Sequence, residues 1–349
     1  GCLLLAAVVT ADGAAAPPGR ADLLDALTAT PPDAQNVLMD VVERVIKELE
    51  ASGDCDSSLL LLDFSVNDAY EAAPAAVLAA HEVAVRSGDE RAVRLQANGV
   101  NVEFFANAPM WWMTYEKSSA GGRLQEWNRR DHARYLAIVV KQARTQWGVN
   151  VKSLEPFNEP LAGWWNYPVG QEGLNLSVAE QAEILGYLRN ELDAQGLSDV
   201  SIAASDENAM SQAVSGYQAL SGIAVPVGSG TESAASLIGK VNVHGYAGLE
   251  PWRDDSVRTA LRQTVGDKRI WLSEYGDNDG SGLKLAQSIV ADINYLRPTA
   301  WVYWQPVEPY SPWGFLNGQY SAPEDETSPT RGSIWWLYSK HYVFAQFSR

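Results

Sequence analysis

Two apolar runs of the chain each lead into a glutamate. The run Val151 to Phe157 is followed by Asn158 and Glu159, and the run over residues 269–273 is followed by Glu274. A proline or glycine comes next in both places, so we expect each glutamate at the C-terminal end of a buried strand. Two carboxylates brought together can supply a proton donor and a nucleophile or base, which is the pair that glycoside hydrolysis uses. Glu159 and Glu274 are therefore the candidate catalytic residues. Each glutamate taken alone also fits an exposed loop.

Polar and aromatic residues crowd the ends of the same and neighbouring runs, and this favours a site over two unrelated loops. Aromatic faces pack against the C–H faces of sugar rings, although any single tryptophan can equally be a core residue. Glu207 is the main rival carboxylate, because it also follows an apolar run. The candidate substrate-binding residues are Asn107, Trp111, Trp112, Asn158, Trp164, Trp165, Glu207, His244, Tyr246, Tyr275 and Trp304.

No metal or cofactor is expected at this site. His244 has no histidine or cysteine partner at metal-ligand spacing, which favours a substrate contact or a hydrogen-bonded strand-end histidine. The chain contains no Gly-x-Gly-x-x-Gly or Walker pattern, so it has little in common with nucleotide-binding oxidoreductases.

The elements that position these residues alternate between strand and helix. We expect strands over residues 100–105, 151–157, 200–204, 240–243, 269–272 and 300–303, and helices over 132–146, 177–195, 211–220, 257–264 and 283–295. A regular alternation of strand and helix predicts either a parallel (β/α)8 TIM barrel or a doubly wound sheet. Polar residues at every strand end favour the barrel, whose whole rim forms a site.

Composition excludes several classes of partner. The 349-residue chain is 46% hydrophobic and carries a formal net charge of −17, which would repel nucleic acids and anionic membrane surfaces. No stretch has the 18 or more apolar residues that a membrane span requires. We expect a monomer that binds a polysaccharide or oligosaccharide.

Three segments are expected along the chain. Residues 1–19 resemble part of a secretory signal, which predicts a secreted protein, and the alternative is a buried first strand. Residues 20–99 are an atypical first part of the barrel, made of helices and a strand over 57–66. Residues 100–349 form the catalytic barrel. Cys2 and Cys55 are the only cysteines, so a disulfide framework is not expected.

Five motifs in order resemble glycoside hydrolase family 30, and within it the secreted endo-β-1,6-galactanases. The likeness covers roughly residues 95–349. The motifs are Glu103 to Thr114, Glu155 to Pro160, Ala204 to Glu207, Val243 to Tyr246 and Leu272 to Gly276. The resemblance implies a general acid/base at Glu159 and a nucleophile at Glu274 in a retaining double displacement. It requires a raised pKa at Glu159 and a normal or lowered pKa at Glu274.

The chain also departs from that family. The family's tryptophan-rich first strand and the arginine on its second strand are missing from residues 1–94, and the sequence after the barrel is too short for the family's C-terminal β-sandwich. The leading hypothesis is an endo-acting hydrolase of β-1,6-linked galactan. The alternatives are a non-catalytic carbohydrate-binding barrel, or a related enzyme acting on β-glucan, xylan or β-glucosides.

Overall fold

The computed structural model describes residues 101–246, 255–305, 307–309, 312–319 and 334–347, together with two short strands at Leu4–Leu5 and Leu59–Asp63. The rest of the predicted segments 1–19 and 20–99, with Cys2 and Cys55, lies outside the described residues. Leu4–Leu5 pairs with the strand Ala300–Tyr303, as a buried first strand would. The leader over residues 1–19 stays a prediction.

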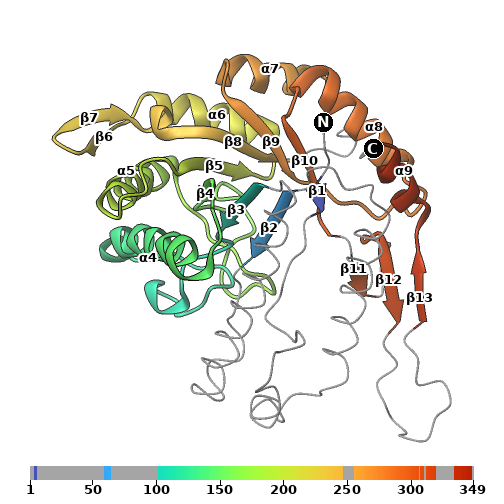
Figure 1. Ribbon diagram of the computed structural model, residues 1–349, viewed down its shortest axis with the longest axis horizontal. Coiled ribbons are helices and arrows are strands. Elements are labelled where there is room, and N and C mark those ends of the chain that lie inside the picture. The colour runs from blue at the N-terminus through green and yellow to red at the C-terminus, as the bar shows by residue number, and fades with distance from the viewer. Residues whose placement is uncertain are drawn as a thin grey trace, which may run out of the picture.

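Eight parallel strands form one curled sheet of the TIM-barrel type (Figure 1). The order across the sheet is β1-β10-β9-β8-β5-β4-β3-β2. The predicted fold class is therefore confirmed, and every predicted strand from residue 100 onward is present. The strands are β1 (Leu4–Leu5), β2 (Leu59–Asp63), β3 (Asn101–Phe105), β4 (Ser153–Glu155), β5 (Ser201–Glu207), β8 (Ile238–His244), β9 (Arg269–Glu274) and β10 (Ala300–Tyr303).

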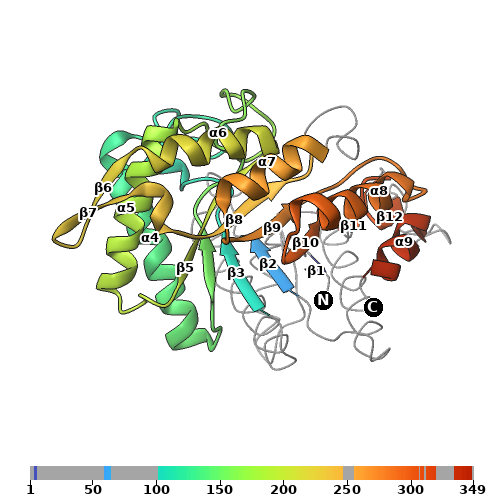
Figure 2. The ribbon, with the colours of Figure 1, turned by 90° about the horizontal axis from the view of Figure 1, so that it is seen from above.

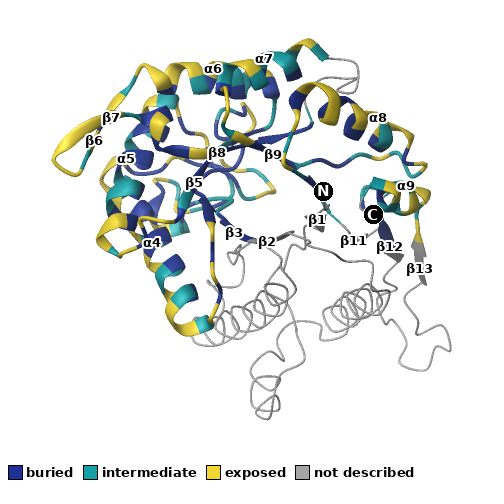
Figure 3. Ribbon diagram, turned by 45° about the horizontal axis from the view of Figure 1, so that its top comes forward, coloured by how far each residue is buried: buried dark blue, intermediate teal, exposed yellow. Residues whose placement is uncertain are grey.

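Helices cover the outer face of this sheet, as the view from above shows (Figure 2). Their inner sides are buried and their outer sides exposed (Figure 3). All five predicted helices are found, two of them extended by a π-turn. The α-helices are α4 (Arg129–Gln142), α5 (Val178–Ala194), α6 (Met210–Ser221), α7 (Asp255–Val265), α8 (Leu283–Ala291) and α9 (Ser339–Phe347), and the π-turns are Ala143–Trp147 and Asp292–Leu296. Among the described helices, none combines the length and apolarity that crossing a membrane requires.

Local sequence explains the helix that follows the first glutamate. Ser177 caps α5 by accepting the backbone N–H of Glu180, and the Glu180 carboxylate accepts the N–H of Ser177 in return. Gly186 lets α5 approach Val225 closely, because a Cβ at that position would lie 3.1 Å from the valine side chain. The capping box thus fixes where the β4–α5 loop ends.

Two smaller sheets and three short 3₁₀ helices were not predicted. The hairpin of β6 (Ala224–Val227) and β7 (Gly230–Ser233) follows α6, and a three-stranded sheet is made of β11 (Val307–Pro309), β12 (Leu316–Gln319) and β13 (Ile334–Leu337). These strands are three or four residues long and lack a clear alternation of polar and apolar residues. The 3₁₀ helices are Trp111–Met113, Glu126–Asn128 and Ala234–Leu237.

The interior of the barrel contains a buried ion pair. Glu103 of β3 contacts the Lys240 ammonium and accepts hydrogen bonds from Ser153 and, at 2.8 Å, from Asn242. Burial lowers the pKa of Lys240 to about 8, against the pull of the Glu103 charge. The ammonium also lies 2.7 Å from the centre of the Trp271 ring. Pairing and hydrogen bonds together make the burial of these charges tolerable.

Candidate active site

Glu159 lies directly after β4 in a turn held by several hydrogen bonds. Its φ of 47° is in the left-handed region, and its backbone N–H donates to the carbonyl of Asp206 over 2.9 Å. The Trp165 indole donates to the Glu159 carbonyl over 3.0 Å, and the Asn208 amide donates to its Oε1 over 2.6 Å. A conformation that is uncommon for a non-glycine residue is thus fixed by partners on two elements.

Glu274 ends β9, and the aromatic residues around it bury most of its side chain. The Tyr246 hydroxyl hydrogen-bonds its carboxylate, and the Tyr246 ring packs between Tyr275 and Trp313, with centroids 6.4 and 6.0 Å away. Gly276 leaves room for this arrangement, because a Cβ there would collide with the Trp313 indole. The side chain of Glu274 keeps 13% of its surface exposed, so this carboxylate remains accessible.

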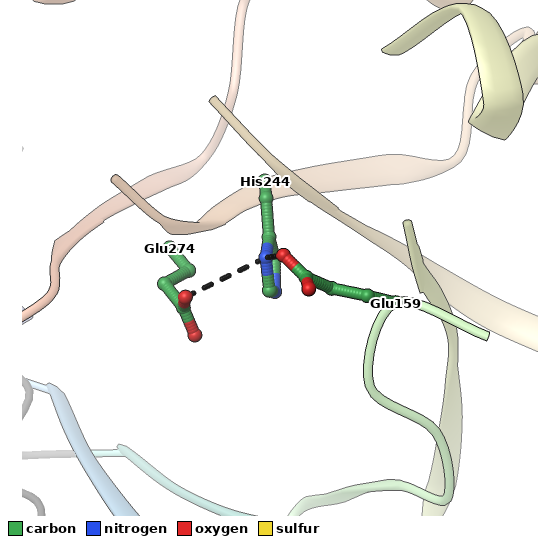
Figure 4. Close-up of side chains that lie close together, drawn as sticks. All are labelled: Glu159, His244 and Glu274. Carbon is green, nitrogen blue, oxygen red and sulfur yellow. Dashed lines mark hydrogen bonds and ion pairs between the residues drawn. The ribbon is translucent and has the colours of Figure 1, made fainter. Parts of the chain in front are cut away.

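His244 lies between the two glutamates at the end of β8 (Figure 4). Its Nδ1 lies 2.9 Å from Glu159 Oε1 and 3.6 Å from Glu274 Oε1. Its Nε2 lies 3.1 Å from Asp206 Oδ2. The ring is completely buried. The structure therefore brings together three carboxylates around one imidazole, drawn from β4, β5, β8 and β9.

This arrangement shifts proton affinities inside the site. Although burial alone would lower the pKa of His244, the Glu274 and Asp206 charges raise it well above its usual value. Burial raises the pKa of Glu274 to about 8, with the charges of Glu159 and Asp206 adding to it and His244 and the Tyr246 hydroxyl opposing it. The expectation of a normal or lowered pKa for Glu274 is therefore wrong for this structure, because three buried carboxylates share one cation.

Glu159, His244 and Glu274 each present an atom that could bind a metal ion, and these atoms lie within 4.8 Å of one another. The raised pKa of His244, however, favours the charged ring, in which both nitrogens carry a proton and neither has a free lone pair for a metal. The Glu159 charge also raises the pKa of Glu274. The cluster is therefore better suited to proton chemistry.

Glu207 faces away from the other carboxylates. Its Oε2 accepts the backbone N–H of Leu161 over 3.1 Å, and its neighbours include Gln181 of α5 and Gly216 of α6. Burial raises its pKa to about 8. The structure places this residue where it fastens the β4–α5 loop behind Glu159.

The other predicted residues divide into three groups. Asn158 is buried, and its Oδ1 has no partner among the described residues. Trp165 and Tyr275 are buried, and the Tyr246 hydroxyl hydrogen-bonds Glu274. Trp112 and Trp164 lie on the loops after β3 and β4, where they are 41% and 50% exposed. The partly exposed residues Asn107, Trp111 and Trp304 lie in the loops after β3 and β10.

Sequence reasoning missed Asp206 and Asn208, which reach the site from the end of β5, and Trp313. The register of β5 shifts between Ser205 and Glu207, and Asp206 has a left-handed φ, so regular strand alternation could not place these two acids. Trp313 follows β11, beyond the last predicted strand, and no local pattern linked it to the site.

Comparison with known proteins agrees with the fold and the motifs. No protein-family model matches the chain. The chain shares the parallel barrel of glycoside hydrolase family 30: it superimposes on the catalytic domain of the GH30 xylanase C from Talaromyces cellulolyticus with a TM-score of 0.60 and 17% identity, covering 99% of this chain and 75% of that one. The chain also superimposes on the GH30 subfamily 8 xylanase Xyn30A from Clostridium acetobutylicum. The TM-score is 0.57 and the sequence identity 19%, and the match covers 83% of this chain and 64% of that one.

In sequence, the chain is similar to an endo-β-1,6-galactanase from Hypocrea rufa, with 36% identity over 261 residues. The match covers 73% of this chain and 50% of the galactanase, so the chain spans about half the length of that relative. The chain is thus similar in sequence to an endo-β-1,6-galactanase and shares its fold with xylanases of glycoside hydrolase family 30. The resemblance inferred from the five motifs is confirmed.

Proposed function

We propose that this chain is a retaining endo-glycoside hydrolase that cleaves β-1,6-linked galactan by double displacement. The observation that carries the proposal is the spacing of Glu159 and Glu274. One carboxylate oxygen of Glu159 lies within 4.8 Å of one carboxylate oxygen of Glu274. Retaining glycosidases hold their two carboxyl groups about 5–5.5 Å apart, whereas inverting ones leave roughly 6.5–9.5 Å for a water molecule.

The roles follow from the surroundings of each glutamate. Glu159 protonates the leaving oxygen while Glu274 attacks the anomeric carbon, and Glu159 then takes a proton from the water that releases the sugar. This sequence needs the proton of the coupled pair on Glu159 and the charge on Glu274. The Tyr246 hydroxyl favours that distribution, because its hydrogen bond lowers the pKa of Glu274 against the burial that raises it.

Two further features support a sugar substrate. The unpartnered Oδ1 of Asn158 lies beside Glu159 and can accept a sugar hydroxyl, an interaction that strengthens as the oxocarbenium ion forms. Trp112 and Trp164 present exposed rings on two adjacent loops, where sugar faces can stack. The choice of β-1,6-linked galactan rests on the named activity of the 36% identical relative. The leader-like residues 1–19 support an extracellular location, and a monomer stays a prediction.

Removing one carboxylate at a time tests the proposal. We expect Glu274→Gln to lower kcat on β-1,6-galactan by about 10³-fold or more while sugar binding persists, because the amide cannot form the glycosyl-enzyme bond. Glu159→Gln should slow substrates with poor leaving groups most, since these need the acid. The unaltered chain should release a mixture of oligosaccharides early, as an endo-acting enzyme does.

Asn166→Ala is the matched control, because the Asn166 amide is exposed and donates only to the carbonyl of Gly163. It should keep full turnover. Unchanged product release from Glu274→Gln would refute the assignment. A folded chain that binds galactan but never cleaves it would instead establish the carbohydrate-binding alternative.

A further inference from the structure

Asp206 contacts three residues of the candidate site, Glu159, His244 and Ser273, from one buried position at the end of β5. Its carbonyl accepts the backbone N–H of Glu159 over 2.9 Å, and its Oδ1 accepts the hydroxyl of Ser273, the residue before Glu274. Its Oδ2 lies 3.1 Å from His244 Nε2. Asp206 is 2% exposed, and its φ of 56° is left-handed, like that of Glu159. A strained residue with three partners in a site is a candidate for a functional constraint.

The surroundings of His244 determine the charge on its ring. Nδ1 faces Glu159 Oε1 at 2.9 Å and Nε2 faces Asp206 Oδ2 at 3.1 Å. Three carboxylates with an oxygen within 3.6 Å of a ring nitrogen favour the charged form of the imidazole over the neutral one. The contact of Nε2 with Asp206 is an ion pair rather than an aligned hydrogen bond. Only a positively charged ring gains much from such a contact.

We propose that Asp206 is a positioning residue, which holds His244 as an imidazolium between Glu159 and Glu274 and thereby sets which glutamate carries the proton of the pair. Its effect on turnover rests on the function proposed above. The charge on the ring does not, and it can be measured without any substrate.

The cluster contains more acidic than basic side chains, so removing one negative charge changes the balance of charge around His244. Among the described residues, eight charged or titratable side chains lie around His244, six on five strands and two in the loops that follow β4 and β8. They are Glu103 of β3, Glu155 of β4, Asp206 and Glu207 of β5, Lys240 of β8 and Glu274 of β9, with Glu159 after β4 and Tyr246 after β8. Glu103 is paired with Lys240, and burial raises the pKa of Glu155 well above its usual value. The His244 cation is therefore held by Asp206, Glu159 and Glu274.

The effect on Glu274 has a definite sign. His244 lowers the pKa of Glu274 more than Asp206 raises it. If removing the Asp206 charge also neutralises His244, the pKa of Glu274 rises. The acidic limb of kcat/KM, which needs ionised Glu274, then moves to higher pH.

The chain offers a closely matched set of variants. Asp206→Asn keeps the shape of the side chain, and asparagine tolerates a left-handed φ well. Glu207→Gln makes the same chemical change one residue along the strand, on the face that bonds Leu161. Ser273→Ala removes only the hydroxyl that Asp206 accepts and leaves the Asp206 charge in place, so the imidazolium should persist in this variant.

The direct test is nitrogen NMR of histidine-labelled protein, which resolves imidazolium from neutral rings. The chain has four histidines, and burial lowers the pKa of His132 to about 4, so that ring is neutral near pH 7. We expect one imidazolium to persist at a pH of about 7.5, well above the usual histidine value. The His244→Asn spectrum assigns it. It should disappear in Asp206→Asn and remain in Glu207→Gln.

In the same variants, we expect Asp206→Asn to lower kcat about tenfold or more, with little change in KM. A neutral His244 in the unaltered chain would overturn the proposal, as would identical spectra and pH profiles for Asp206→Asn and Glu207→Gln. If Asp206→Asn fails to unfold cooperatively, the charge on His244 in the unaltered chain decides alone, and a neutral ring there would overturn the proposal. If the spectra behave as expected and the chain does not hydrolyse galactan, the proposed function fails and the assignment of Asp206 stands.

Discussion

Glu159 and Asp206 share an unusual backbone conformation, and the two residues are joined to each other by a hydrogen bond. Left-handed φ values cost about 1–3 kcal/mol for such residues and persist only where the surroundings impose them. Here they direct Glu159 and Asp206 toward the same imidazole, from β4 and β5. The strain is concentrated at the residues to which we assign proton transfer and positioning.

Glu207 gives a stability prediction with a definite sign. Its folded-state pKa is about 8 and its ordinary value is 4.5, so between these values the folded chain keeps a proton that the unfolded chain has lost. The unfolding free energy must therefore fall as pH rises through this window. Glutamine resembles the protonated acid. We expect Glu207→Gln to be more stable than the unaltered chain at pH 8, by roughly 4 kcal/mol, and nearly equal to it at pH 4.5.

Chemical denaturation across pH checks this prediction. Glu232→Gln is the control, because Glu232 is exposed on β7 and its substitution should leave the slope with pH unchanged. A slope that stays the same in Glu207→Gln would show that Glu207 is ionised in the folded chain.

At the residue scale, sequence reasoning identified the two glutamates and most of their neighbours but not the roles of Asp206 and Glu207. The glutamates were found because an apolar run and a chain-breaking residue flank each of them. The contacts of Asp206 join β4, β8 and β9, whose residues lie far apart in sequence. Only the folded sheet shows such a convergence.

Among the elements, α9 has an unexpected connection to the site. Lys340 of α9 is fully buried, and its ammonium donates to the Asp277 carbonyl over 2.6 Å and to the Tyr303 hydroxyl over 2.8 Å, with the Asp277 carboxylate 3.2 Å away. Asp277 in turn accepts the Tyr275 hydroxyl over 2.8 Å. The helix thus fixes the loop that directly follows Glu274.

Replacing this lysine should destabilise the chain. Lys340→Met leaves the Asp277 carboxylate without its cation and two buried oxygens without a donor, for which we expect a loss of about 3 kcal/mol in unfolding free energy. Tyr342→Ala on the same helix should change stability by less than about 0.5 kcal/mol, because Tyr342 is 61% exposed. Thermal unfolding measures both. Equal losses would show that the ion pair at Lys340 contributes nothing specific.

Taken as a whole molecule, the chain repeats one pattern, and this repetition made the fold predictable. Each strand that is buried on both faces reads as a continuous apolar run, and each helix on the outer face reads as an amphipathic one. The β6–β7 hairpin and the three-stranded sheet were missed because their short strands are placed by packing against larger elements. The parallel sheet then brings the ends of β4, β5, β8 and β9 together, as the prediction of a site required.

The spacing of the two glutamates makes a statement about stereochemistry that one measurement can test. Early-time proton NMR would follow the first product released by the purified chain from a β-1,6-linked galacto-oligosaccharide, before mutarotation mixes the anomers. Two carboxyl groups this close predict initial release of the β-anomer, through a glycosyl-enzyme formed on Glu274. Initial release of the α-anomer would mean inversion and would contradict the role of Glu274 as the nucleophile.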